Sequence, residues 1–183
     1  MNHARLETIL AKLKDRNINQ MIISDPYAIL YLTGRFIDPG ERLLALYISG
    51  DGAHRIFINN LFTVPEELGV EKIRFNDTDD YLSLLCGCIK KGEPLGIDKN
   101  FPARFLLPVI GRSGASRFEL SSICVDEARA VKDEDEKEKM RAVSAINDQA
   151  MARFRGLIKE GVTEKEIAAK MQEEGILSPP KYR

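Results

Sequence analysis

The sequence predicts an α/β domain in which helices flank a mixed β-sheet, followed by a helical C-terminal extension. In the first two thirds of the 183 residues, short apolar runs of strand length alternate with segments of helical periodicity. Two consecutive strand patterns are joined by the turn Gly50-Asp51-Gly52, so at least one pair of strands is expected to be antiparallel. Beyond residue 126 the chain becomes charge-rich and keeps helical periodicity alone. We therefore expect an α/β domain at 1–126 and a second, incomplete domain at 127–183.

The elements of the first domain follow from apolar spacing and from residues that begin or end a helix. Asp25 followed by Pro26 is typical of a helix N-terminus, because the carboxylate caps the helix and proline fits its first position. Gly34 suits the end of that helix, since glycine adopts a positive φ without penalty. The sequence predicts helices at 4–16, 27–32, 64–68, from 79 onward and at 103–110, and strands at 21–23, 43–48, 54–58, 70–75, 94–97 and 118–125.

The extension begins with a dense charge run at 133–141, which we interpret as the solvated face of a helix. Asp133 with Glu136, and Thr163 with Glu166, each have the spacing of a capping box, so two helices are expected. Two helices cannot enclose a core of their own, and residues 176–183 predict no further element. An apolar stripe at helical spacing is expected to pack in a core rather than in a coiled coil, and consists of Met140, Val143, Ile146, Ala150, Phe154 and Leu157.

Composition argues against several classes of partner. The net charge is −1 with acids and bases interspersed, which does not favour nucleic-acid binding. The first residues lack the apolar core of a signal peptide, and no window reaches membrane-spanning length, so we expect a cytoplasmic protein without a membrane partner. The three cysteines, Cys86, Cys88 and Cys124, form no metal or disulfide pattern and are interpreted as buried thiols.

No nucleotide-binding or nucleophile motif occurs, and a complete active site is not visible. His3 and His54 have no metal-type spacing to another histidine or cysteine. The acidic cluster Asp77, Asp79 and Asp80 imitates a calcium loop but lacks its glycine and terminal glutamate, so we interpret it as a helix cap. We assign no catalytic residue and no metal ligand.

The charged turn at 35–42 lies between a predicted helix and a predicted buried strand. The sequence Asp38-Pro39-Gly40 at its centre favours chain reversal at the surface. Proline fixes φ for the first part of the turn, and glycine adopts the next backbone conformation without steric cost. Its charges allow two interpretations, a solvated turn or a binding loop. The four candidates are Arg35, Asp38, Glu41 and Arg42.

Several segments together resemble bacterial Xaa-Pro dipeptidases (prolidases) and the related aminopeptidase P enzymes. They include Tyr31-Leu-Thr-Gly34, Asp38-Pro-Gly-Glu-Arg-Leu43, Gly96-Ile-Asp98, Ala128-Arg-Ala-Val-Lys-Asp-Glu-Asp-Glu136 and Gly161-Val-Thr-Glu164. The resemblance implies a creatinase-like N-terminal domain without catalytic residues, followed by the first helices of a "pita-bread" domain. In such enzymes that second domain binds two divalent metals, manganese or cobalt, whose bridging hydroxide attacks the amide bond before proline.

The resemblance also limits what this chain is expected to do. The family's metal ligands (two Asp, one His and two Glu) lie beyond the helices matched here, and no histidine follows His54. We therefore expect no cofactor in this chain and no activity of the chain alone; a truncated end, a shortened gene or a frameshift would each explain its length.

In the prolidases, a similar loop reaches across a homodimer to the partner's active site. The resemblance therefore implies that Asp38, Glu41 and Arg42, and less directly Arg35, contact a proline-containing dipeptide in trans. A stand-alone dimerisation or regulatory module that binds a full-length relative is the alternative. Creatinase-like amidine hydrolysis shares the fold, but the Asp38-Pro-Gly-Glu-Arg turn favours the peptidases.

Overall fold

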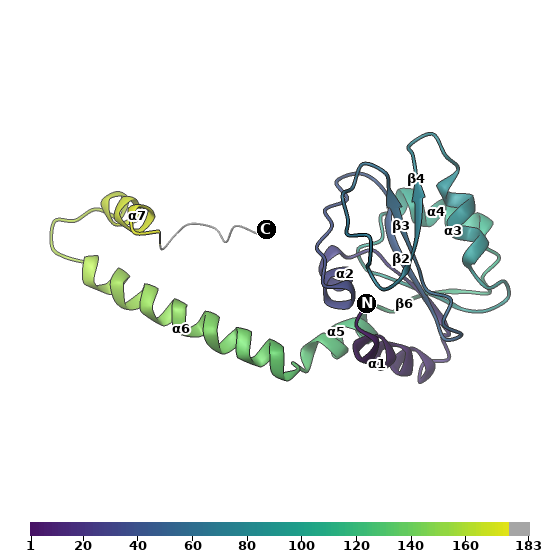
Figure 1. Ribbon diagram of the computed structural model, residues 1–183, viewed down its shortest axis with the longest axis horizontal. Coiled ribbons are helices and arrows are strands. Elements are labelled where there is room, and N and C mark those ends of the chain that lie inside the picture. Colours follow the sequence, from purple (N-terminus) through teal and green to yellow (C-terminus); the bar gives the residue numbers. More distant parts are fainter. Residues whose placement is uncertain (176–183) are drawn as a thin grey trace. The chain divides into compact units, whose positions relative to one another are not determined.

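The structure is a computed structural model that describes residues 1–175. The backbone divides into two compact units, Met1–Val131 and Lys132–Arg183 (Figure 1). The first unit contains all the strands of the described chain, and the described part of the second is helical. Each unit is therefore described by itself.

A six-stranded sheet forms the centre of the first unit, with strand order β4-β3-β2-β1-β5-β6. The β1–β2 and β2–β3 pairs are antiparallel, whereas the β3–β4, β1–β5 and β5–β6 pairs are parallel, so the expected mixed sheet is confirmed. The strands are β1 (Gln20–Ile23), β2 (Leu44–Ser49), β3 (Arg55–Asn59), β4 (Glu71–Phe75), β5 (Leu95–Ile97) and β6 (Phe118–Leu120).

Helices cover both faces of the sheet and create two apolar cores. Alternation along β1 shows this directly, because Met21 and Ile23 belong to one core and Ile22 to the other. Helices α1 (His3–Lys14), α2 (Pro26–Thr33) and α5 (Ser122–Ala130) contribute to the first core. Helices α3 (Tyr81–Cys88) and α4 (Ala103–Arg112) contribute to the second. The inner strands β3, β2, β1 and β5 are thus buried on both sides, which explains their largely apolar sequences, whereas the edge strands β4 and β6 are partly exposed.

Helix α2 has the ends that its sequence predicts. The Asp25 carboxylate accepts a hydrogen bond from the Tyr27 N–H at 3.2 Å, and Pro26 occupies the first helical position. Gly34 ends the helix at φ 73° and donates its N–H to the Leu30 carbonyl at 2.8 Å. The predictions of α1, α3 and α4 are also confirmed, with α4 accommodating Pro108 inside the helix.

Two predictions in the first unit are wrong. Residues 64–68 form no helix, and the Pro65 carbonyl accepts a hydrogen bond from the Lys72 ammonium at 3.2 Å. Strand β6 ends at Leu120, and the second half of the predicted 118–125 strand is the start of α5. Cys124, Val125 and Ala128 are buried at helical spacing, so packing on the first core decides the conformation of this ambiguous apolar run.

The extension consists of α6 (Glu134–Leu157) and α7 (Glu164–Glu173). Both predicted capping boxes are confirmed, with reciprocal hydrogen bonds between Asp133 and Glu136 and between Thr163 and Glu166. No residue of α6 is buried, so the expected core packing of its apolar stripe is not seen within the described part of the second unit. Of the expected stripe, Met140, Val143 and Ile146 are exposed by 57–65%. The prediction for the tail from residue 176 lies outside the described residues.

The cysteine interpretation is largely confirmed. Cys86 and Cys124 are buried and Cys88 is half-buried, all three as free thiols. Burial raises the pKa of the Cys86 and Cys124 thiols, so neither is poised as a thiolate. No helix within residues 1–175 is long and apolar enough to cross a lipid bilayer.

Candidate functional site

The charged turn at 35–42 is built by local hydrogen bonds and held by one apolar side chain. The Asp38 carboxylate accepts from the Gly40 N–H at 3.1 Å, and the Arg42 N–H donates to the Pro39 carbonyl at 2.9 Å. Gly40 has φ 53°, so the turn relies on glycine there. Ile37 is only 4% exposed and anchors the turn on the first core. The expected chain reversal therefore has defined geometry.

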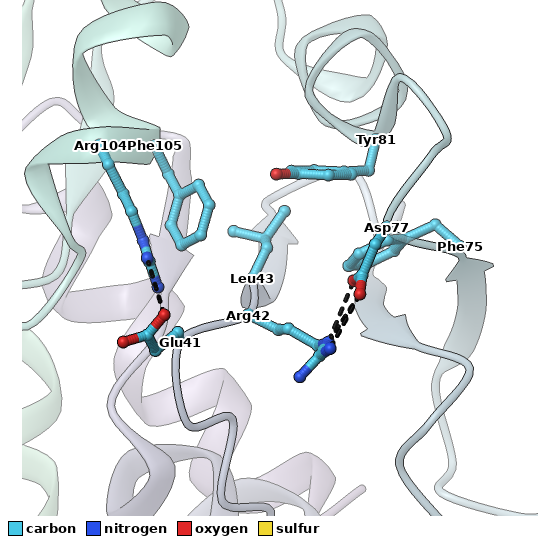
Figure 2. A pocket seen from close by; sticks show the side chains of 8 residues that line it. All are labelled: Glu41, Arg42, Leu43, Phe75, Asp77, Tyr81, Arg104 and Phe105. Atoms are coloured by element: carbon cyan, nitrogen blue, oxygen red, sulfur yellow. Dashed lines mark hydrogen bonds and ion pairs between the residues drawn. The ribbon is translucent and has the colours of Figure 1, made fainter.

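A cavity of about 300 Å³ lies beside the end of this turn (Figure 2). Its apolar lining comes from four elements and includes Leu43 just before β2, Phe75 at the end of β4, and Tyr81 of α3. Phe105 of α4 completes this apolar part, and its ring centroid lies 6.3 Å from that of Tyr81. Charged residues complete the lining, namely Glu41, Arg42, Asp77 and Arg104.

Arg42 and Asp77 form a bidentate ion pair at one side of the cavity (Figure 2). The Arg42 Nε and Nη2 donate to the Asp77 carboxylate at 3.0 and 2.8 Å, and the Asn59 amide donates to the same carboxylate at 2.7 Å. These hydrogen bonds hold the pKa of Asp77 below its usual range and raise the pKa of Arg42. The pair therefore ties the turn to the ends of β3 and β4.

Glu41 and Arg104 face each other at the other side of the cavity, with 4.0 Å between their charged atoms. The Arg104 guanidinium also lies over the Phe105 ring, 4.8 Å from its centroid. The Glu41 side chain is 93% exposed, so this pair is open to solvent and weak. The cavity thus combines an apolar lining with charges of both signs.

The structure brings together two of the four predicted site residues. Glu41 and Arg42 line the cavity, whereas Arg35 and Asp38 do not. Arg35 and Asp38 are exposed in the same turn, where Arg35 donates its N–H to the Thr33 hydroxyl at 3.2 Å. Arg35 and Asp38 therefore lie at the surface on either side of the buried Ile37, and Glu41 and Arg42 contribute to a cavity.

Sequence reasoning missed Asp77, Tyr81 and Arg104 as cavity residues. The helix-cap interpretation of the acidic cluster is right for Asp80, whose carboxylate accepts from the Ser83 N–H, but wrong for Asp77. The sequence signal that could have placed Asp77 at the cavity was its position two residues after β4, a strand parallel to β3. Side chains at the carboxyl ends of neighbouring parallel strands meet at one edge of the sheet, as Asn59 and Asp77 do.

The described residues do not fit a metal centre. Within 1–175, no group of three or more His, Cys, Asp or Glu side chains is arranged to hold a metal ion. The Asp77 carboxylate in the cavity is paired with the Arg42 guanidinium, which neutralises its charge. We therefore derive no metal-dependent step from these residues.

Comparison with known families identifies the architecture. Residues 5–131 match the family model described as the creatinase/prolidase N-terminal domain, which covers more than half of the chain. The chain belongs to this family. A second model, metallopeptidase family M24, matches residues 138–179. The creatinase/prolidase N-terminal domain is thus followed by the start of an M24 domain, and the resemblance inferred from the sequence is confirmed.

Individual relatives agree with the family match. The chain is 29% identical over 168 residues to an uncharacterised peptidase of Staphylococcus saprophyticus, covering 89% of this chain and 47% of that protein. It is 27% identical over 177 residues to a probable dipeptidase PepE of Mycobacterium tuberculosis, covering 92% of this chain and 47% of the relative. The chain therefore spans about half the length of the curated relatives it matches.

Solved structures share the fold over the same extent. The crystal structure of dipeptidase PepE from Mycobacterium ulcerans superimposes with a TM-score of 0.81 at 25% identity, covering 95% of this chain and 48% of that one. The creatinase/prolidase N-terminal domain of an X-Pro dipeptidase from Streptococcus pyogenes gives a TM-score of 0.56 at 20% identity. It covers 67% of this chain and 97% of its own, which supports the fold alone.

Proposed function

We propose that this chain is the N-terminal, non-catalytic portion of a proline-specific metallopeptidase that resembles Xaa-Pro dipeptidase. The observation that carries the proposal is the order of the two family matches, with the N-terminal domain at 5–131 followed directly by M24 sequence at 138–179. The similarity to PepE dipeptidases over about half of their length supports it. In this proposal the domains divide near residue 126, and the protein acts in the cytoplasm.

The parent reaction would be hydrolysis of the amide bond before proline. A pair of divalent metals, manganese or cobalt, supplies an activated hydroxide in such chemistry. The ligands would come from parts of the M24 domain beyond the matched segment. This chain would contribute a folded domain, contacts for dimerisation and the turn at 35–42.

The turn would act in trans, over the active site of a partner subunit. Arg35 and Asp38 are exposed and could meet the charged ends of a dipeptide, while Glu41 and Arg42 lie where the turn joins the sheet. The bidentate Arg42–Asp77 pair supports this role, because it limits the motion of the turn and lowers the entropy lost on binding.

An activity assay tests the non-catalytic assignment. The purified chain, incubated with glycyl-proline and Mn²⁺, is expected to release no proline above the rate without protein. Turnover at rates typical of a dipeptidase would refute the assignment.

A fusion to the remaining half of Mycobacterium tuberculosis PepE tests the turn. In an active fusion, Asp38→Asn and Arg35→Ala should each raise KM for glycyl-proline by about fivefold, as expected for one lost hydrogen bond. Glu67→Gln, an exposed carboxylate outside the turn, is the matched control and should leave KM unchanged. Unchanged KM in both turn variants would contradict the role in trans.

A second candidate is a stand-alone dimerisation or regulatory module. The exposed apolar stripe of α6 favours it, because exposed apolar patches of this kind mark interaction surfaces. Sedimentation of the chain alone and mixed with a full-length relative separates the candidates. Co-sedimentation with altered peptidase activity would favour the module, and a monomer that leaves the relative unaffected would exclude it.

A further inference from the structure

Helix α6 presents an apolar face that the described chain does not cover. The helix runs unbroken through 24 residues, which span about 36 Å, and none of them is buried (Figure 1). Four of its large apolar side chains are more than half exposed, namely Met140, Val143, Ile146 and Met151. Apolar side chains gathered on one face of an exposed helix mark a surface at which another chain docks.

The core positions of this face follow a strict heptad. Ile146 makes the apolar spacing drift, but with the neighbouring Asn147 in its place the positions recur after three and four residues in turn. They are Met140, Val143, Asn147, Ala150, Phe154 and Leu157. This repeat is the pattern of a two-helix coiled coil, in which Ile146 and Met151 flank the seam. One partner helix therefore covers all four exposed apolar side chains.

Asn147 narrows the choice of that partner. A single asparagine in an otherwise apolar seam lowers the affinity of a coiled coil but fixes its register and the number of its chains. The reason is that a buried amide needs a polar group to bind. A purely apolar surface cannot supply one, whereas a second copy of α6 brings an identical amide.

The two ends of α6 carry opposite charge. Residues 133–139 contain five acids and two bases, a net charge of −3, and residues 153–159 contain three bases and no acid, a net charge of +3. An antiparallel second copy places each acidic end near the basic end of the other helix and also opposes the two helix dipoles. A parallel copy would bring like charges together at both ends. Charge complementarity therefore selects a second copy in the antiparallel orientation.

One antiparallel register matches every core position when the pair is centred between residues 148 and 149. Its layers pair Met140 with Leu157, Val143 with Phe154, and Asn147 with Ala150 of the second copy. The small side chain of Ala150 leaves room for the amide opposite it. The two copies of Asn147 are offset by three residues, about 4.5 Å along the axis, so each amide lies within reach of the other.

We propose that α6 binds a second copy of this chain as an antiparallel two-helix coiled coil with Asn147 at its centre. The proposal rests on the second candidate function, the dimerisation module, and does not depend on peptidase activity. Three heptads with polar central layers make a short interface, so a dissociation constant of about 100 µM is expected. Dilute chain therefore stays monomeric with its stripe exposed.

Sedimentation of the 183-residue chain from about 5 to 500 µM, a range that brackets the expected dissociation constant, tests the pairing. Val143→Glu should weaken the dimer about hundredfold, because each dimer gains two carboxylates in the apolar seam. The variant should keep its helix, since glutamate is a better helix former than valine. Ala145→Glu adds the same charge about 200° around the helix and should change the affinity by less than about twofold.

The two ways of failing are distinct. A chain that remains monomeric at about 500 µM would refute both the pairing and the dimerisation module. A dimer that Val143→Glu leaves as tight as that of the unchanged chain would use another surface, which refutes the α6 pairing and leaves the module standing.

Charge reversal tests the orientation. Arg153→Glu combined with Arg155→Glu places negative charge near the acidic end of the other copy and should weaken an antiparallel dimer about fivefold at low salt. In a parallel dimer the same change reduces repulsion between the two basic ends, so the dimer would become tighter and the proposed orientation would be wrong. Lys14→Glu with Lys91→Glu, exposed in the first unit, makes the same change of net charge and should have no effect.

Contacts between copies locate the seam directly. In a mixture of isotope-labelled and unlabelled chain, filtered nuclear Overhauser spectra should connect the Val143 methyl groups of one copy to the Phe154 ring of the other. Contacts of Val143 with another part of its own chain, and none between copies, would mean that the stripe is covered from within and would overturn the proposal.

Discussion

The two units of this chain are stabilised in different ways. In Met1–Val131, a sheet covered on both faces buries long apolar side chains such as Phe57 and Ile22, both 0% exposed. In the described part of the second unit, Met171 is the buried residue of α7, and α6 has none. Their capping boxes and the exposed Lys137–Glu134 ion pair of α6 stabilise these helices locally. Tertiary burial therefore supports the first unit, and local interactions support the second.

The difference predicts that mutations of the same kind act unequally in the two units. Phe57→Ala should destabilise the first unit by about 3–5 kcal/mol, since it removes a fully buried ring from the sheet. Val143→Ala, in the exposed stripe of α6, should change stability by less than about 0.5 kcal/mol. Urea denaturation followed by circular dichroism measures both. Comparable losses would show that α6 is covered by part of a core.

Alkaline pH should weaken the first unit through Tyr47. Burial raises the pKa of Tyr47 to about 12, and its hydroxyl donates to Gln20 at 2.9 Å. The pKa of Tyr47 in the folded chain exceeds its unfolded value of about 10. The contribution of this tyrosine to the free energy of unfolding is therefore complete below about pH 10 and is lost as the pH rises to about 12.

The loss is expected to be about 2–3 kcal/mol, from roughly two pKa units. Tyr47→Phe should remove this part of the pH dependence while costing about 1 kcal/mol at neutral pH. Unfolding midpoints measured from pH 8 to 12 decide this. If the midpoint of Tyr47→Phe fell with pH as steeply as that of the unchanged chain, the assignment to Tyr47 would be wrong.

Loss of a cap should affect the second unit alone. Asp133→Ala removes the side chain that accepts the Glu136 N–H at 2.9 Å and should cost about 1 kcal/mol of helix stability. Hydrogen exchange should accelerate in the first turns of α6 and leave the β-sheet amides unchanged. Asp148→Ala, an exposed residue inside α6, is the control. Faster exchange in the sheet would mean that the two units are energetically coupled.

The smallest effect is expected at Asp77. Asp77→Asn should leave the unfolding midpoint nearly unchanged, because the Arg42–Asp77 pair is exposed. It should accelerate amide exchange at 40–42, where the pair holds the turn. Folding lowers the pKa of Asp77. The stabilisation from the Arg42–Asp77 pair is therefore fully present above the usual pKa range of a carboxyl group, and it is lost as the pH falls through the pKa that Asp77 has in the folded chain. Asp15→Asn, an exposed carboxylate at the end of α1, should alter neither property.

Prediction from the sequence succeeded wherever neighbouring residues carry the signal. Asp25 with Pro26, and Thr163 with Glu166, act within one helical turn, so their pattern is enough to locate α2 and α7. Prediction failed where the partner is distant in sequence. Residues 122–125 are apolar in either conformation, and packing of Cys124 and Val125 on the first core makes them helical.

The candidate site shows the same division. The charged turn and its candidates Glu41 and Arg42 were visible in the sequence, because glycine, proline and clustered charges mark a surface reversal. Asp77 and Arg104 were not, because they lie 35 and 63 residues from Arg42 and Glu41 along the chain.

The sequence by itself determined the mixed α/β fold, the helix ends, the family resemblance and the position of the charged turn. These follow from the spacing of apolar side chains and from short-range hydrogen bonds. Only the tertiary structure decided which charges pair around the cavity beside the charged turn, and that Met140, Val143 and Ile146 of the α6 stripe are exposed. The physical reason is that pairing and burial depend on distances in space, which the folded sheet establishes between residues far apart in the chain.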